Sequence, residues 1–372
     1  MKVAIVHDQL REFGGAERVL MSIKSLFPDA PVYTTTFDLN SLGEHKEQIK
    51  KWDVRLTWFG KIPLLNMSYS PFRFLTPLIW ESLNLKEYDL VISSTGSWMC
   101  KGVVTEKPTI HISYIHHPPR YLYGYQTAIE WQKYWPIKLY GTIANHFLRI
   151  WDLTASKRPD FLIANSIETQ KRIEKFYRRD STVIYPPVSI PKTFDITHYT
   201  LHKPYFITVS RLARAKHVDL LIEAANEEKC ELHIVGIGRD ETYLKSLAGP
   251  TVRFLGNISD KKLAEELRGA KGFLFASVDE EFGIAPVEAM GYGVPVIAFA
   301  SGGLKETVKE GINGYLYNEL TILSLTQTIR KLQELSAETY SQMRLNARKE
   351  AEKYSEENFK KRFMEFLKKH LQ

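Results

Sequence analysis

Apolar and amphipathic segments alternate along most of the chain. Short runs rich in Val, Ile and Leu have the length and composition of buried strands, whereas the longer segments between them have helical periodicity. The first strands are expected at 3–7, 32–35, 90–93, 109–114, 161–164 and 182–184, and helices at 16–26 and 167–177. Such alternation predicts parallel sheets with helices on both faces.

This alternation is interrupted once. Tyr185-Pro186-Pro187-Val188 breaks the pattern, and a polar stretch follows to Lys203, which predicts an interdomain linker. A second series of strands is then expected at 205–209, 232–235, 252–255, 272–276 and 294–300. From about Leu320 the sequence is nearly all helical. The chain therefore predicts an α/β fold of two Rossmann-like doubly wound domains, 1–195 and 196–353.

The segment between the strands 272–276 and 294–300 is the most informative part of the sequence. A short helix is expected over 285–292, and its first amides, at Gly283, Ile284 and Ala285, would point beyond the carboxyl end of the preceding strand. Free amides at a helix N-terminus favour an anion such as a diphosphate. Glu280 and Glu288 flank this predicted site.

The spacing of these two glutamates, within Glu-Phe-Gly-Ile-x-Pro-x-Glu-Ala-Met-x-x-Gly-x-Pro-Val, closely resembles the signature of glycosyltransferase family 4. That family consists of retaining enzymes with two facing Rossmann-like domains, the GT-B fold. The resemblance implies that Glu280 contacts the donor sugar and Glu288 the nucleotide ribose, with Phe282 also at the donor. It further implies that a last helix, 354–372, returns to the first domain. The alternative is that both carboxylates merely flank a helix at the surface.

Two cations follow the first strand of the second domain. The family resemblance places Arg211 and Lys216 on the donor diphosphate, where two positive charges could neutralise the leaving group without a metal ion. Arg214 is expected to lie in solvent, and a solvated basic loop is the alternative for all three. Asp-x-Asp is absent from the sequence, as is any His/Cys/Asp cluster with ligand spacing, so no metal is expected.

Candidate ligand contacts in the first domain also follow strands. Gly14 and Gly15 come after the first strand, and Gly14–Arg18 resembles a branch of family 4 rich in mannosyltransferases. By the resemblance, His116 lies near the donor sugar, with His117 as the competing choice and a purely structural role equally open. Ser166, with Asn165 before it, is a further donor-contact candidate.

The nucleobase pocket is expected between loops of the second domain. The resemblance implies backbone contacts and an apolar wall there, formed by Gly236, Phe254 and Ile258. Such contacts do not indicate which base is bound.

Length and charge add information about partners. The 372 residues favour two domains, and the formal net charge is +7. Residues 1–195 hold 25 Lys/Arg against 19 Asp/Glu, which favours an anionic partner for the first domain. The aromatic and basic segments 72–80 and 146–151 fit docking onto an anionic membrane, although core helices explain them equally well.

Cysteine usage and hydropathy bear on the compartment. Cys100 and Cys230 have no disulfide spacing, the first strand leaves no room for a signal peptide, and no apolar run approaches the length of a membrane span. These features predict a cytoplasmic protein, which the membrane-docking hypothesis places at the inner face of the cell membrane.

The function predicted from these features is retaining transfer of a hexose. Mannose from GDP-mannose is the best guess, on the resemblance alone, with a lipid-linked or oligosaccharide acceptor, no cofactor and no nucleic-acid partner. Four alternatives stay open. They are a UDP-hexose donor, a soluble acceptor of the starch or sucrose type, a non-catalytic nucleotide-sugar-binding scaffold, and an epimerase of the same architecture, against which the signature argues.

Overall fold

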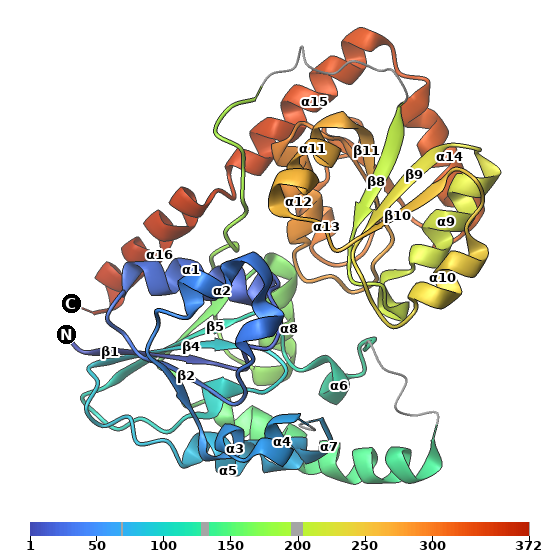
Figure 1. The fold of residues 1–372 in the computed structure, drawn as a ribbon. Coiled ribbons are helices and arrows are strands. Elements are labelled where there is room, and N and C mark those ends of the chain that lie inside the picture. Colours follow the sequence, from blue (N-terminus) through green and yellow to red (C-terminus); the bar gives the residue numbers. More distant parts are fainter. Residues whose placement is uncertain (68–69, 128–133, 195–203, 372) are drawn as a thin grey trace. The chain divides into compact units, whose positions relative to one another are not determined.

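The chain forms two compact units in a computed structural model that describes residues 1–67, 70–127, 134–194 and 204–371. The first unit combines Met1–Pro187 with Glu356–Gln372, and the second is Val188–Ser355 (Figure 1). The sequence placed these divisions at 195/196 and 353/354. Part of the expected linker, 195–203, lies outside the described residues.

The first unit is built on a seven-stranded parallel sheet of order β3-β2-β1-β4-β5-β6-β7. Its strands are β1 Val3–His7, β2 Val32–Thr34, β3 Val54–Leu56, β4 Leu90–Thr95, β5 Ile110–Ile115, β6 Phe161–Ala164 and β7 Thr182–Val183. The order reverses between β1 and β4. In doubly wound sheets, ligands bind beyond the carboxyl ends of the strands at such a point.

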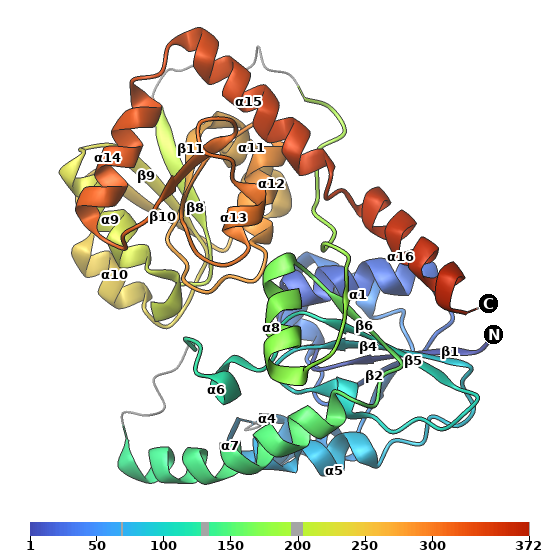
Figure 2. The same ribbon diagram turned by 180° about the vertical axis from the view of Figure 1, so that it is seen from behind.

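Helices cover both faces of this sheet (Figures 1 and 2). Side chains alternate along β1: Ile5 packs in a cluster with α1 and α16, whereas Val6 packs on the opposite face with α5. The α-helices are α1 Gly15–Leu26, α2 Lys46–Ile49, α3 Trp58–Lys61, α4 Pro63–Met67, α5 Thr76–Glu81, α6 Arg120–Tyr123, α7 Trp135–Ala155, α8 Ile167–Tyr177 and α16 Glu356–His370. Short 3₁₀ turns are η1 Leu39–His45, η2 Ser70–Leu75 and η3 Cys100–Gly102.

The C-terminal helix α16 belongs to the core of the first unit. Phe359, Phe363, Phe366 and Leu367 are buried in the cluster that also contains residues of β1, β4, β5 and α1. In addition, Ser22 of α1 donates a hydrogen bond to Glu356 at 3.2 Å. The final helix therefore lies with the first unit, as the family resemblance implied.

The second unit has a six-stranded parallel sheet of order β10-β9-β8-β11-β12-β13. Its strands are β8 Tyr205–Val209, β9 Glu231–Val235, β10 Val252–Gly256, β11 Ala270–Phe275, β12 Val296–Phe299 and β13 Gly314–Tyr317. The helices are α9 Val218–Glu227, α10 Glu241–Leu247, α11 Asp260–Gly269, α12 Ile284–Gly291, α13 Leu304–Thr307, α14 Ile322–Gln333 and α15 Ala337–Glu352, with a 3₁₀ turn, η5, at Arg214–Lys216.

The predicted fold class of two doubly wound parallel-sheet units is confirmed. Two edge strands, β3 and β13, were not predicted, because β3 is only three residues long and partly exposed and β13 opens with a glycine. The 21-residue helix α7 was not among the predicted helices, and only its segment 146–151 was noted, as aromatic and basic. Over the described parts of the chain, no helix is both long and apolar enough to span a bilayer.

Candidate active site

The strongest cluster of polar groups in the second unit lies where the strand order reverses. β8 and β11 are neighbours in the sheet, and because all strands are parallel, the segments after them emerge at the same edge. Arg211 and Lys216 follow β8, and Ser277 and Glu280 follow β11. The fold therefore brings together residues that are more than 60 positions apart in the sequence.

Lys216, Ser277 and Glu280 form a connected triad. Lys216 Nζ lies 2.6 Å from Glu280 Oε2, and Ser277 Oγ donates to the same oxygen at 2.8 Å. Lys216 Nζ is also 3.3 Å from Ser277 Oγ. The Lys216 and Glu280 side chains keep 24% and 18% of their surface exposed, so a ligand can reach both charges. Ser277 was not among the predicted site residues.

A second loop holds the backbone of Glu280. Gly303 N donates to the Glu280 carbonyl at 2.8 Å, and Ser301 Oγ accepts from Asp279 N at 3.0 Å. Gly302 has a φ of +57°, and a Cβ atom there would lie 2.0 Å from the Glu280 carbonyl oxygen. Only glycine fits this approach. The Gly302-Gly303 pair shortly after β12 was the available signal, and neither glycine was among the predicted site residues.

The helix α12 begins as the motif predicted. Gly283 adopts a left-handed conformation with a φ of +85° and caps the helix, so the next amides, from Ile284 and Ala285, belong to its first turn. Glu288 lies one turn further along and is half-buried. Phe282, by contrast, is 2% exposed and packs edge-to-face on Tyr354 with ring centroids 5.1 Å apart, which makes it a packing residue of the loop.

Glycines also shape the loop that carries Arg211. A Cβ atom on Gly236 would lie 2.0 Å from the Ser210 carbonyl, and one on Gly238 would lie 2.1 Å from the Leu212 carbonyl. The segments after β8 and β9 therefore touch through their backbones, with the exposed Arg211 between these contacts. Phe254 and Ile258, on and after β10, are half-buried at the same edge.

His217, next to Lys216, is half-buried. Burial lowers the pKa of its imidazole, with a smaller lowering from Arg214 and an opposing contribution from Asp219. Arg214 itself lies over the ring of Tyr243, 5.3 Å from its centroid, and is exposed as predicted.

In the first unit, His116 belongs to a buried hydrogen-bonded chain. Its Nε2 lies 2.8 Å from Ser94 Oγ, which lies 3.1 Å from His7 Nδ1, and His7 Nε2 lies 3.5 Å from Glu17 Oε1. Which atom donates in each of these contacts depends on the tautomers of His7 and His116.

The remaining predicted contacts of the first unit are engaged within the protein. Gly14 N donates to Glu17 Oε2 at 2.9 Å, so the carboxylate of the Gly14–Arg18 motif occupies an amide that had been assigned to a ligand. Ser166 is fully buried and caps α8 by accepting from Thr169 N at 3.0 Å. His117 Nδ1 lies 3.0 Å from the Pro118 carbonyl.

No group of three or more His, Cys, Asp or Glu side chains able to hold a metal ion occurs in the described part of the chain. Arg211 and Lys216 supply positive charge at the carboxyl edge of the second sheet. Lys216 is paired with Glu280, four residues before α12 begins, and the helix dipole adds partial positive charge at that end of α12.

Comparison with known proteins covers both units. Residues 190–350 match the family described as Glycosyl transferases group 1. The UDP-N-acetylglucosamine–peptide N-acetylglucosaminyltransferase GtfA subunit of Streptococcus pneumoniae serotype 4 is 28% identical over 255 residues, which are 63% of this chain but only 47% of that protein. The alpha-1,3/1,6-mannosyltransferase alg2 of Schizosaccharomyces pombe is 25% identical over 376 residues, 85% of this chain and 70% of that protein.

Solved structures resemble the chain over nearly its whole length. HepE from Anabaena in complex with UDP has a TM-score of 0.70 at 21% identity, covering 99% of this chain and 100% of that one. Sucrose-phosphate synthase from Thermosynechococcus elongatus has a TM-score of 0.76 at 18% identity, covering 99% of each chain. At these identities the likeness concerns the fold. Residues 190–350 thus resemble the Glycosyl transferases group 1 family, in a chain whose two-unit α/β fold matches that of GT-B glycosyltransferase structures.

Proposed function

We propose that this chain is a retaining glycosyltransferase that moves a hexose from a nucleotide sugar to a hydroxyl of a lipid-linked or oligosaccharide acceptor. Mannose from GDP-mannose is the leading choice of donor. The nucleotide sugar is a substrate, and the reaction requires neither a cofactor nor a metal ion. The observation that carries the proposal is the triad of Lys216, Ser277 and Glu280. It places the ammonium group of Lys216 and the carboxylate of Glu280 at the point where the strand order of the second sheet reverses.

The triad suits the charges that develop during transfer. When the bond from the anomeric carbon to the diphosphate breaks, the sugar gains positive charge and the leaving phosphate gains negative charge. Lys216 and Arg211 neutralise the phosphate together with the first amides of α12. Glu280, released from Lys216, accepts hydrogen bonds from the sugar hydroxyls, while Glu288 accepts from the ribose.

The acceptor attacks on the face that the diphosphate leaves. The oxygen of the departing phosphate takes the proton of the acceptor hydroxyl, so the new glycosidic bond forms as the old one breaks and the anomeric configuration is retained. This route needs no enzymic nucleophile. His116, which the family resemblance puts near the donor sugar, forms a hydrogen bond with a sugar hydroxyl, and its ring is held by Ser94.

The comparisons support a hexose but leave two donors. The alg2 relative is named a mannosyltransferase, which favours mannose. The HepE structures contain UDP and UDP-glucose, so a UDP-hexose is the alternative donor. The two cases differ in the nucleotide that stabilises the protein, because a ligand at 100 times its Kd adds about 2.7 kcal/mol to the free energy of unfolding.

The decisive experiment measures transfer from GDP-mannose and UDP-hexoses and determines the anomeric configuration of the product by NMR. Glu280→Gln and His116→Ala are expected to lower kcat more than donor affinity, because they lose contacts that strengthen in the transition state. Arg214→Met, on the same loop as Lys216, is the control and keeps wild-type kinetics. An inverted product, or near-normal turnover of Glu280→Gln, would refute the mechanism, and donor binding without turnover would favour the scaffold alternative.

We also propose that the first unit associates with an anionic membrane surface, at the cytoplasmic face where a lipid-linked acceptor would be presented. The excess of Lys and Arg over Asp and Glu in residues 1–195 supports this partner. Attraction between exposed charges is screened over roughly 10 Å at 0.1 M salt. Binding to anionic vesicles should therefore weaken as salt rises, and absence of binding at low salt would contradict the proposal.

A further inference from the structure

The helix α7 presents an apolar surface on its exposed side. Ile143, Phe147 and Ile150 are 54%, 67% and 56% exposed, and their spacing of four and three residues puts them on one face. Trp135, at the start of the helix, is 76% exposed. Water-exposed side chains of this size in a row are unusual for a helix that packs only on its own unit.

The charged side chains near this face of α7 are all basic. No Asp or Glu occurs from 135 to 151, whereas Lys138 and Arg149 are both exposed. Asp152, which follows, is fully buried and paired with Lys101. A helix with an exposed apolar face, basic flanks and terminal Trp or Tyr residues is typical of segments that lie in a membrane interface.

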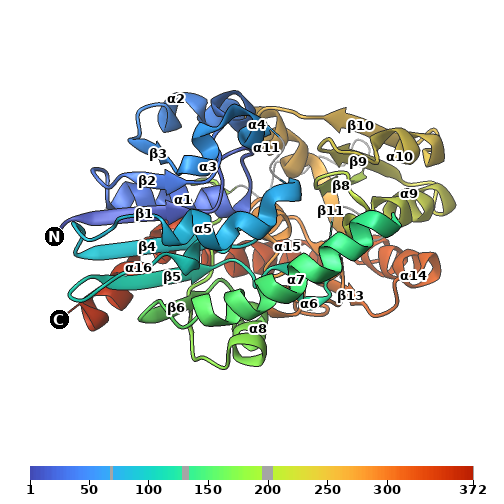
Figure 3. The ribbon, with the colours of Figure 1, turned by 90° about the horizontal axis from the view of Figure 1, so that it is seen from below.

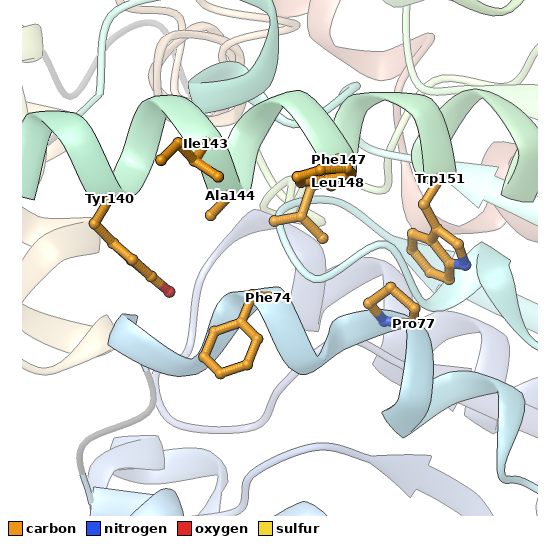
Figure 4. A pocket seen from close by; sticks show the side chains of 8 residues that line it. All are labelled: Phe74, Pro77, Tyr140, Ile143, Ala144, Phe147, Leu148 and Trp151. Atoms are coloured by element: carbon orange, nitrogen blue, oxygen red, sulfur yellow. The ribbon is translucent and has the colours of Figure 1, made fainter.

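An apolar cavity of about 480 Å³ lies between α7 and the η2–α5 segment. Figure 3 shows the ribbons of α5 and α7, and Figure 4 shows the side chains that line the cavity. This volume falls within the roughly 300–1,000 Å³ of small-molecule sites. Its lining consists of apolar and aromatic side chains, namely Phe74, Pro77, Tyr140, Ile143, Ala144, Phe147, Leu148 and Trp151.

The few polar atoms of this lining are already engaged. The Tyr140 hydroxyl donates to the Pro71 carbonyl, and Trp151 Nε1 donates to Glu81 Oε1 at 2.7 Å. A peptide or a sugar would leave its own donors and acceptors unpaired against these walls, which is costly. A hydrocarbon chain has none to leave unpaired, so it is the occupant that the lining favours.

A basic residue, Arg73, is the sequence neighbour of a residue that lines the cavity. Arg73 precedes Phe74 on η2, and consecutive Cα atoms are about 3.8 Å apart. Its guanidinium is held over the ring of Tyr121, 4.7 Å from the centroid, and lies 5.9 Å from that of Trp98. Its Nε is buried and lacks a hydrogen-bond partner among the described residues. A guanidinium stacked in this way suits a phosphate, which it can bind with two parallel hydrogen bonds.

We infer that the cavity beneath α7 binds the hydrocarbon chain of a phosphorylated lipid, with Arg73 at the phosphate and the exposed face of α7 in the bilayer interface. This inference deepens the proposed function, on which it rests for the lipid's role as acceptor. The proposed membrane association then depends on a defined lipid site, in which the cavity binds the hydrocarbon chain and Arg73 binds the phosphate, and not only on attraction to a charged surface.

The first experiment uses soluble probes below their critical micelle concentration. Decyl phosphate and decanol are titrated by calorimetry into the full chain. Ala144→Phe, which fills the cavity, should weaken both probes at least tenfold. Arg73→Gln should weaken decyl phosphate roughly tenfold and leave decanol unchanged. Equal binding of both probes by wild type and Ala144→Phe would overturn the site, as would inorganic phosphate binding as tightly as decyl phosphate.

The second experiment tests the exposed face of α7 with vesicles of phosphatidylcholine and phosphatidylglycerol. Trp135→Gln with Ile150→Gln, two exposed residues of α7 that do not line the cavity, should lower partitioning at least tenfold at 0.5 M salt, where electrostatic attraction is weak. Leu323→Gln is the matched control, since Leu323 is similarly exposed at 63% on a helix of the second unit, and should partition like wild type. Salt-resistant binding unchanged in the double variant would refute interfacial insertion.

Two further measurements separate the alternatives. Sedimentation velocity without lipid should give a monomer. A dimer that Phe147→Gln dissociates would mean that a second copy covers the face, which overturns the inference. Because neither binding assay requires turnover, probe binding without any glycosyl transfer would refute the proposed function and leave the lipid site standing, whereas transfer to a soluble acceptor without probe binding would do the reverse.

Discussion

His111 should make the stability of the first unit fall as the solution becomes acidic. The residue lies on β5 with no exposed surface, and its Nε2 is 2.9 Å from Ser93 Oγ. Nδ1 has no hydrogen-bond partner within the described structure. Protonation would therefore bury an unpaired N–H and a positive charge, with Arg179 and Arg158 nearby to oppose it.

The size of the effect follows from the change in pKa on folding. Burial, and after it repulsion from Arg179 and Arg158, lowers the pKa of His111 from 6.5 to about 3. The folded state stays neutral where the unfolded state takes up a proton, so the stability is complete above the unfolded pKa and is lost as the pH falls below it. Below the unfolded pKa of 6.5, the free energy of unfolding falls by about 1.4 kcal/mol per pH unit. Acidification from pH 7.5 to 5 covers about 1.5 units of that range, so it lowers the free energy of unfolding by about 2 kcal/mol through this residue alone.

Urea denaturation followed by tryptophan fluorescence can measure this loss in the first unit separately. All seven tryptophans of the chain precede Pro187, so the signal reports only that unit. His111→Gln keeps a donor for Ser93 and removes the titrating ring. Its free energy of unfolding should lose about 2 kcal/mol less than wild type between pH 7.5 and 5. His146→Gln, at an exposed ring on α7, should follow wild type. Equal losses in wild type and His111→Gln would refute the reasoning.

Four further outcomes are expected. Asp152→Ala leaves Lys101 as an unpaired buried charge and should destabilise the first unit by about 3–5 kcal/mol in the same fluorescence assay; a loss below 1 kcal/mol would contradict this. Gly302→Ala pushes its Cβ against the Glu280 carbonyl and should lower kcat about 100-fold with the fold intact by circular dichroism. Glu288→Ala should raise the Kd of the nucleotide in calorimetry but change kcat little. Activity should survive excess EDTA. If EDTA abolishes activity and Mg²⁺ or Mn²⁺ restores it, Arg211 and Lys216 are not the only groups that neutralise the diphosphate.

The sequence predicted elements well where burial leaves a strong periodic signal. Strands such as β8 and β11, buried and apolar over most of their length, were placed within two residues. Glu280 and Lys216 were both singled out, but their ion pair depends on β8 and β11 being neighbours, which is a property of strand order rather than of local pattern.

Contacts between loops were harder to predict because they depend on tertiary approach. Nothing local to Gly302 shows that the Glu280 carbonyl lies against it. Glu17 was interpreted as part of a ligand-binding run, yet its carboxylate serves Gly14 and His7. In α7, apolar residues occur on more than one face, so periodicity could not separate core positions such as Leu148 from exposed ones such as Phe147.

The position of α16 has a consequence for biosynthesis. The ribosome releases the chain from its amino end, and domains usually fold in that order as they emerge. Here the second unit, Val188–Ser355, is fully synthesised before the helix that completes the hydrophobic cluster of the first. Until Phe359 and Phe363 have left the exit tunnel, the part of the first sheet that α16 covers stays open to water. The unit translated first is therefore finished last, and during that interval it is the part of the nascent chain most in need of a chaperone.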